Sequence, residues 1–258
     1  MDVSHGRTLK VVEYVDALET AGRALAVAAT EAGPDAEVPT CPGWRVRNLL
    51  RHTSMVHRWA TDLVVHARTA YQPDGGETPL DGDELLAHFR EGQAGLVAAL
   101  RAAPESLECW TFLPAPSPLA FWARRQAHET TVHRADAESA LAAGPRRVEP
   151  SLAVDGIDEL LFGFHGRNRS RVRTAGPRTL RVRATDTGDV WTVRLSAAEP
   201  PRTERDGGAP GPVDTELAGA ADQLYLVLWN RLPVDTVTLT GDAELARVWR
   251  ETSGVTWS

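Results

Sequence analysis

Residues 125–137, RQAHETTVHRADA, carry the most informative pattern in the chain. Glu129 and His133 are four residues apart, so on a helix they lie about one turn apart on the same face. A helix can supply two ligands to one metal ion in this way. A glutamate and a histidine at this spacing are also common on a solvated helix, where the pair contributes only about 0.2–0.5 kcal/mol.

The same segment excludes the zinc-protease motif His-Glu-x-x-His, whose histidines are four residues apart. His128 and His133 are five residues apart, which places them roughly 140° from each other around a helix. Glu129 and His133 remain as candidate ligands, and a third ligand has to come from elsewhere. Asp136 follows His133 by three residues and is either an outer partner that orients the histidine or an exposed aspartate.

A second element, PTCPGW at residues 39–44, predicts a turn that leads into a helix. From residue 45 onward apolar side chains recur at helical spacing, and His52 and His57 lie among them. Their separation of five residues places them on different flanks of the apolar stripe. Each is either a ligand or a core histidine, and the periodicity does not choose between them.

Helical periodicity predicts four long helices in the first part of the chain, with a Pro-rich loop at residues 105–118. The helices are expected at residues 8–32, 45–70, 84–100 and 119–143. This pattern fits a four-helix bundle, in which ligands project inward from facing helices. We assign it to a first domain of residues 1–147.

The pattern changes after Pro150, and residues 148–258 are expected to form a smaller α/β domain with an antiparallel sheet. Period-two alternation at 179–184 and 190–195, around the turn DTGD at 186–189, predicts a β-hairpin. The other expected elements are a helix at 151–164, a mobile loop at 197–212, a helix at 214–231, a strand at 236–240 and a helix at 242–250.

Composition restricts the class of protein. The 258 residues are 42% hydrophobic, which is sufficient for two modest cores. A net charge of −7 argues against a nucleic-acid partner, which normally requires a basic surface. The sequence has neither an apolar run of membrane-spanning length nor a signal peptide, so a cytoplasmic protein is expected. Cys41 and Cys109, its two cysteines, are expected to be free thiols with packing roles.

Four segments resemble the mycothiol-dependent maleylpyruvate isomerase-like family of actinobacteria: CPGWRVRNLLRH at 41–52, HETTVHRAD at 128–136, LVLWNR at 226–231 and LTGD at 239–242. The resemblance spans most of the chain. It implies a DinB-like metal-binding bundle followed by a small α/β domain. It further implies that His52, Glu129 and His133 bind a divalent metal, expected to be zinc, and that Arg231 helps to bind or polarise the substrate.

Two histidines and one carboxylate leave an open coordination position, which is typical of a catalytic zinc site. A thiol bound there would be deprotonated. The resemblance implies that the thiol is mycothiol, so the predicted cofactors are the metal and mycothiol. The predicted function is attack of the thiolate on a small electrophilic substrate, by S-conjugation or by addition and elimination. Arg231 and Asp136 are the predicted catalytic residues, and Arg231 is also the predicted cofactor contact.

Alternatives remain open at this stage. One is strict maleylpyruvate isomerase activity in aromatic catabolism, and another is a non-catalytic bundle that binds a metal or a small molecule. An arginine at a helix end can also simply stabilise the helix dipole, which is the structural alternative for Arg231.

Overall fold

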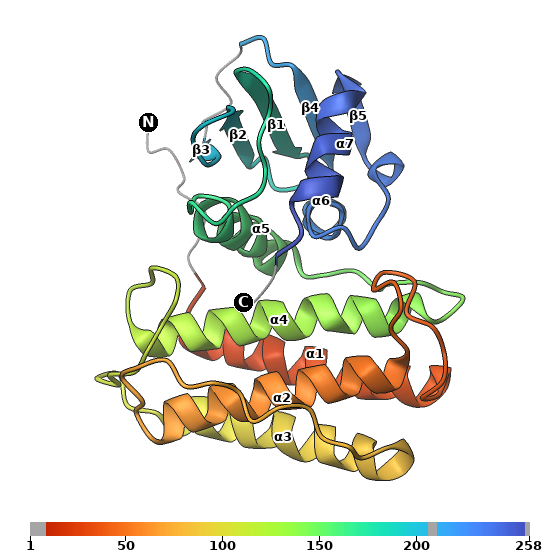
Figure 1. Cartoon of the computed structure of the whole chain (residues 1–258), viewed down its shortest axis with the longest axis vertical. Coiled ribbons are helices and arrows are strands. Elements are labelled where there is room, and N and C mark those ends of the chain that lie inside the picture. Colours follow the sequence, from red (N-terminus) through yellow and green to blue (C-terminus); the bar gives the residue numbers. More distant parts are fainter. Residues whose placement is uncertain (1–8, 206–210, 256–258) are drawn as a thin grey trace. The chain divides into compact units, whose positions relative to one another are not determined.

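The structure is a computed structural model that describes residues 9–205 and 211–255. Within the described residues, the chain divides into two compact units, one of residues 9–146 and the other beginning at residue 147. The first unit is a four-helix bundle and the second combines helices with a sheet (Figure 1), so the predicted fold class is confirmed. None of the helices in the described residues is both long and apolar enough to cross a membrane.

The four bundle helices pack in pairs, with α1 along α4 and α2 along α3, and α2 also contacts α4. Their apolar positions face inward, and Leu18, Leu49 and Phe89 are fully buried. The helices are α1 (Val11–Ala32), α2 (Val46–Val65), α3 (Gly82–Ala102) and α4 (Pro118–Ser139).

The helix α4 begins at a strong local signal. Ser117 is its N-cap, where the hydroxyl accepts a hydrogen bond from the backbone N–H of Ala120 at 3.1 Å. Pro118 occupies the first turn, where its missing N–H costs nothing. The start of the helix is therefore fixed, and Glu129 and His133 fall in its second half.

Two predicted helices end earlier than expected. The helix α2 stops at Val65, because Ala67 takes a positive φ of 47° that a helix cannot continue through. The helix α4 stops at Ser139, and residues 140–143 form tighter turns in which Leu141 N–H donates to the Glu138 carbonyl. The apolar spacing of these turn residues imitates a continuing helix.

The second unit contains a five-stranded sheet in the order β3-β2-β1-β4-β5. The pair β1 and β4 is parallel and the other pairs are antiparallel, so the sheet is mixed rather than purely antiparallel. Its strands are β1 (Arg178–Ala184), β2 (Val190–Leu195), β3 (Arg202–Arg205), β4 (Thr215–Gly219) and β5 (Thr238–Gly241).

Helices cover one face of this sheet. Val182 lies opposite Trp191 in the register, and both are fully buried, whereas Arg183 on the other face pairs with Glu216 at 2.7 Å. The helix α6 contacts β1, β4 and α5. The helical elements are α5 (Pro150–Asp158), the π-helical η1 (Glu159–Phe164), α6 (Ala221–Leu228), the short η2 (Val234–Thr236) and α7 (Ala243–Thr252).

Some sequence predictions hold in this unit and others do not. The hairpin β1–β2 is confirmed. The single helix expected at 214–231 is wrong, because residues 215–219 form β4 and the helix begins only at Ala221. The loop expected at 197–212 contains the strand β3, while its residues 206–210 lie outside the described part.

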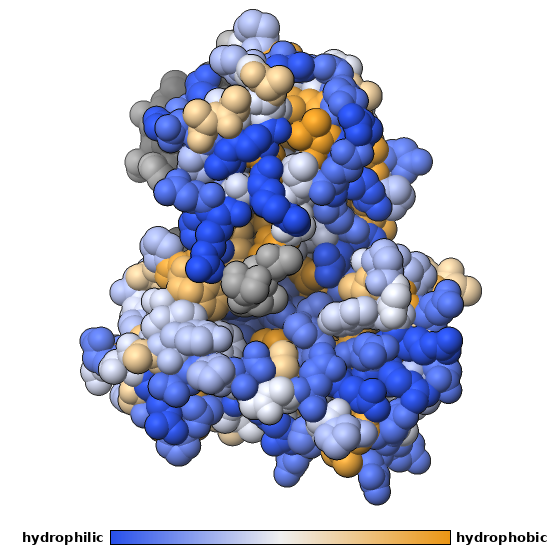
Figure 2. All heavy atoms as spheres, in the orientation of Figure 1, coloured by the Kyte–Doolittle hydropathy of each residue, from blue (hydrophilic) through white to orange (hydrophobic). Residues whose placement is uncertain are grey.

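The side chains at the surface are mainly polar. Figure 2 shows a face on which hydrophilic residues predominate in both units. Within the described residues, the large hydrophobic side chains that are exposed are Val12, Val27, Val65, Tyr71 and Phe162. The apolar content of the chain is therefore mostly used in the two cores.

The end of α6 is closed by a Schellman motif built on Asn230. Asn230 has a φ of 62°, in the left-handed region, and the N–H of Arg231 donates to the Leu226 carbonyl at 2.7 Å. The Asn230 side chain also donates to the Arg250 carbonyl and to the Ser253 hydroxyl, both at 3.1 Å. One residue thus ends α6 and ties it to the end of α7.

We expect Asn230→Ala to destabilise the protein by about 1–2 kcal/mol from the left-handed conformation alone. Asn230→Gly is the matched variant, because it loses the same side-chain hydrogen bonds but accepts a positive φ. Urea denaturation should rank wild type above glycine and glycine above alanine. Equal stability of the two variants would mean that the backbone conformation does not matter here.

Candidate metal centre

The helices α2 and α4 bring three potential ligands together. His52 lies on α2, and Glu129 and His133 lie on α4. One donor atom from each residue lies within 4.8 Å of the other two. Glu129 Oε1 is 3.1 Å from His133 Nε2 and 3.5 Å from His52 Nε2. Candidate ligands from two helices that are distant in sequence therefore meet in one cluster.

These distances agree with the dimensions of a zinc site. Ligand atoms 2.0–2.2 Å from a tetrahedral zinc ion are about 3.4 Å from one another. Two imidazoles and one carboxylate also form a donor set that zinc accepts, and they leave a position open. No fourth histidine, cysteine, aspartate or glutamate joins the cluster within the described residues.

The cluster is nearly closed to solvent. The side chains of Glu129 and His133 are only 5% and 9% exposed, whereas that of His52 is 16% exposed. The His52 side therefore provides the more accessible edge of the cluster.

Asp136 holds His133 from behind. Its carboxylate Oδ2 accepts a hydrogen bond from His133 Nδ1 at 2.8 Å, and Asp136 is fully buried. The other oxygen, Oδ1, accepts from the Thr40 hydroxyl at 2.6 Å. A carboxylate can only accept, so Nδ1 carries a hydrogen, and Nε2 is the nitrogen that faces Glu129. Of the two interpretations left open for Asp136, the exposed aspartate is wrong.

The charges in the cluster require a positive centre. Burial alone would lower the pKa of His133, but Glu129 and Asp136 outweigh it and raise that pKa to about 9. Burial alone would raise the pKa of Glu129, but His133, His52 and Arg125 hold it well below its ordinary value. Without a metal ion, a proton on His133 Nε2 lies between this nitrogen and Glu129 Oε1 and supplies the positive charge. A divalent cation would meet the same requirement.

His57 does not belong to this cluster. It is fully buried, and its Nε2 lies 2.8 Å from the Thr130 hydroxyl. Burial is the main reason that its pKa falls to about 3. His57 is therefore a neutral core histidine, and the geometry favours His52 as the third ligand.

Trp44 contacts two residues of the cluster. Its ring lies 5.2 Å from that of His52 and 6.5 Å from that of His133, stacked on the latter at 18°. A type II turn positions it: Gly43 has a φ of 85°, and the Trp44 N–H donates to the Cys41 carbonyl at 2.9 Å. The turn at residues 39–44 therefore supplies an apolar wall.

Two further contacts lie beyond what sequence patterns reveal. The Arg125 guanidinium donates to Glu129 Oε2 at 3.4 Å, and Thr40 reaches Asp136 across 96 residues of sequence. Neither belongs to a known ligand pattern. Cys41 and Cys109 are not joined in a disulfide and lie outside the cluster, and burial raises the pKa of the Cys109 thiol.

Arg231 belongs to the second unit. It follows the end of α6 and donates to the Trp229 carbonyl at 2.8 Å. This contact is the one expected of an arginine that stabilises a helix end. Its role toward a substrate stays a prediction.

Comparison with known proteins gives a consistent family. The family profile of the mycothiol maleylpyruvate isomerase N-terminal domain matches residues 15–138, and that of the corresponding C-terminal domain matches residues 151–247. No curated protein matches the sequence.

Two solved structures share the fold over nearly the whole chain. One is the mycothiol-dependent maleylpyruvate isomerase, which is 15% identical, with a TM-score of 0.61. The other is a histidine-to-alanine mutant of that enzyme, which is 14% identical, with the same TM-score. Each comparison covers 90% of this chain and 93% of the other. At this identity they establish the fold alone.

We expect the purified chain to bind about one divalent metal ion, and His52→Ala, Glu129→Ala and His133→Ala each to lose it. The exposed His66, near the end of α2, provides the matched control, because His66→Ala removes an imidazole outside the cluster. Asp136→Asn leaves all three ligands in place and should weaken binding by about 10–100-fold. Elemental analysis and chelator competition measure these effects. Metal retained in all three alanine variants would contradict the assignment.

Metal affinity should also depend on pH. Because the pKa of His133 is raised to about 9 without metal, this imidazole is protonated at pH 7 and binding must release its proton. The apparent affinity should rise about tenfold per pH unit between pH 7 and 8.5 and level off above pH 9. Chelator competition at several pH values tests this, and a pH-independent affinity would show that His133 is not a ligand.

Proposed function

Since the chain belongs to the mycothiol maleylpyruvate isomerase family over both of its units, we propose that it is a metal- and mycothiol-dependent isomerase. In this proposal the thiolate of mycothiol adds to a small electrophilic substrate and then leaves again. The isomerase named by the family is favoured over the broader thiol transferase or isomerase predicted from the sequence. The proposal assigns the metal chemistry to residues 1–147 and a substrate-binding role to residues 148–258.

The observation that carries the proposal is the convergence of His52, Glu129 and His133 within 4.8 Å. Their nitrogen and oxygen donor atoms face one another in a buried place, where a positive charge between them makes the arrangement favourable. A histidine-rich packing site would not need Asp136 behind His133 at 2.8 Å. That hydrogen bond is typical of a histidine held ready to bind a metal.

A divalent ion held by these three groups would lower the pKa of a thiol beside it, so that the thiol reacts as a thiolate near neutral pH. Neighbouring residues orient and shield the three candidate ligands. Asp136 fixes the tautomer of His133, and Arg125 donates to the outer oxygen of Glu129 at 3.4 Å. Trp44 covers His52 and His133 with an apolar ring, which keeps the local dielectric constant low and strengthens the electrostatic interactions.

The proposed reaction conserves all atoms. The thiolate forms a C–S bond to one carbon of a conjugated double bond, and the electron pair moves onto the neighbouring carbonyl. Rotation then occurs about the resulting single bond, and breaking the C–S bond restores a trans double bond and the thiolate. S-conjugation differs only in the last step, where the adduct takes up a proton and keeps the C–S bond.

Arg231 is proposed to hold or polarise the carbonyl end of the substrate, on the basis of the family resemblance. A guanidinium ion suits this task because it is always charged and binds a carboxylate through two parallel hydrogen bonds. Asp136 is proposed as a positioning residue, since it contacts His133 rather than a reacting atom. A non-catalytic bundle is the weaker alternative, because the three candidate ligands are all present and together. A cytoplasmic location stays a prediction.

The test is an isomerisation assay with maleylpyruvate, followed by proton NMR and mass spectrometry. Metal-loaded chain with mycothiol should convert the cis substrate to the trans isomer, and omitting either metal or thiol should stop the reaction. Glu129→Ala should lower kcat/KM by more than about 100-fold, the upper end for the loss of an outer-sphere residue. His66→Ala should leave kcat/KM unchanged.

A stable mycothiol adduct without trans product would replace the isomerase proposal by S-conjugation. A metal-loaded chain that binds mycothiol but yields neither product would contradict maleylpyruvate as the substrate. A chain that takes up no metal would refute the metal-dependent mechanism itself.

A further inference from the structure

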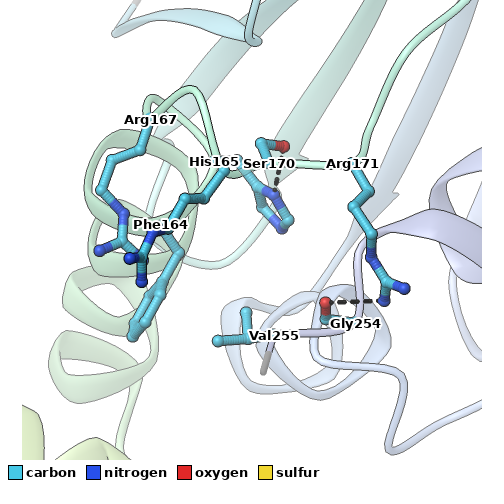
Figure 3. A pocket seen from close by; sticks show the side chains of 8 residues that line it. Phe164, His165, Arg167, Ser170, Arg171, Gly254 and Val255 are labelled. Atoms are coloured by element: carbon cyan, nitrogen blue, oxygen red, sulfur yellow. Dashed lines mark hydrogen bonds between the residues drawn. The ribbon is translucent and has the colours of Figure 1, made fainter. Parts of the chain in front are cut away.

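The second unit contains a cavity of about 330 Å³. Three arginines, Arg167, Arg169 and Arg171, line it together with His165 and Ser170, and none of its lining residues is acidic. Figure 3 shows His165 between the side chains of Arg167 and Arg171, with Val255 and Gly254 facing them. The cavity shares no residue with the metal centre.

His165 is the buried polar group of this cavity. It is only 3% exposed, and its Nδ1 lies 3.0 Å from the Ser170 hydroxyl. Its other nitrogen, Nε2, is buried and has no hydrogen-bond partner among the described residues. Buried polar atoms nearly always have a partner, so this nitrogen is the candidate contact for a ligand in the cavity.

The Ser170 hydroxyl can donate to His165 Nδ1, which would leave the hydrogen of the ring on Nε2. The Ser170 hydroxyl oxygen accepts from the Val172 N–H at 3.3 Å, so its own hydrogen is available for His165 Nδ1. In this arrangement Nε2 carries the hydrogen and is a donor. Burial is the main reason that the pKa of His165 falls to about 4, with a further contribution from Arg167, so the ring is neutral at pH 7.

The arginines repel one another across the cavity wall. Burial lowers the pKa of Arg167, and the positive charge of Arg169 lowers it further. An anion placed between the guanidinium groups would reverse this cost, because each group would then face an opposite charge. The positive charges of the lining residues therefore favour an oxyanion as the ligand.

The walls of the cavity are fixed before any ligand binds. The Arg173 guanidinium donates to the carbonyls of Ser170 and Val172 at 3.0 and 2.8 Å. These hydrogen bonds fix the conformation of the loop at residues 167–173. Arg171 donates to the Gly254 carbonyl at 3.2 Å, and Asn230 holds Ser253. The two sides of the cavity are thus joined by hydrogen bonds.

We propose that this cavity binds a small metabolite bearing a doubly charged oxyanion, a phosphate monoester or a dicarboxylate. The arginines bind the charge through forked hydrogen bonds, and His165 Nε2 adds one directional donor. Phe164 and Val255 contact the carbon part of the ligand. A volume of about 330 Å³ is at the lower end for ligand pockets, which favours a small metabolite over a nucleotide.

The test is calorimetric titration of the metal-loaded full chain at low ionic strength, with inorganic phosphate and with succinate in separate runs. One of the two should bind saturably with a stoichiometry of one. Tighter binding of phosphate would identify a phosphate ester as the ligand class, and tighter binding of succinate a dicarboxylate. Arg169→Gln and Arg171→Gln, both at exposed positions, should each weaken binding about tenfold, the effect of losing one charge-assisted hydrogen bond.

Arg194→Gln is the matched control, because it removes the same charge from an exposed position on β2, in the second unit but outside the cavity. Its affinity should equal that of wild type. A nitrogen-15 NMR titration of the wild type needs no variant, and the His165 Nε2 signal should shift on ligand addition. The proposal is overturned if neither anion binds, if the cavity variants bind as wild type does, or if Arg194→Gln weakens binding equally.

Discussion

The structure of the first unit depends on one buried carboxylate. Glu129 faces two imidazole nitrogens at 3.1 and 3.5 Å, in a place where an unbalanced charge would cost several kcal/mol. The surrounding groups balance or position this negative charge. Arg125 contacts one carboxylate oxygen, a proton or a metal ion balances the other, and Asp136 holds the imidazole that faces it.

The parts that sequence could predict are those encoded over short distances. The four helices of the bundle follow from apolar periodicity, and the spacing of Glu129 and His133 follows from one helical turn. Prediction from apolar periodicity was wrong where a segment fits both a helix pattern and a strand pattern. Leu217 and Ala218 suit a helix face, but residues 215–219 pair with both β1 and β5, and that pairing depends on strands distant in sequence. The short strand β3 was missed for the same reason.

The candidate site also combines features that local sequence predicts with features that depend on contacts distant in sequence. Its ligands on α4 could be identified from spacing, whereas the choice between His52 and His57 required either a family resemblance or the packing of α2 on α4. Trp44 and Thr40 reach the cluster through a turn whose geometry depends on Gly43. Their contacts with residues of α4 cross about 90 residues of sequence, and no local pattern encodes them. The arginine cavity of the second unit was also hidden, because its charges come from an irregular loop.

The division of the ligands between two helices has a kinetic consequence. Glu129 and His133 belong to one helix and would hold an ion as a chelate that moves as a single body, while His52 is attached to another helix and has the most exposed side chain of the three. An ion leaving the cluster would therefore lose His52 first and remain held at two points by α4. In that case the separation of α2 from α4 would govern the exchange rate of the ion, and the lifetime of the loaded state would measure how often the bundle opens.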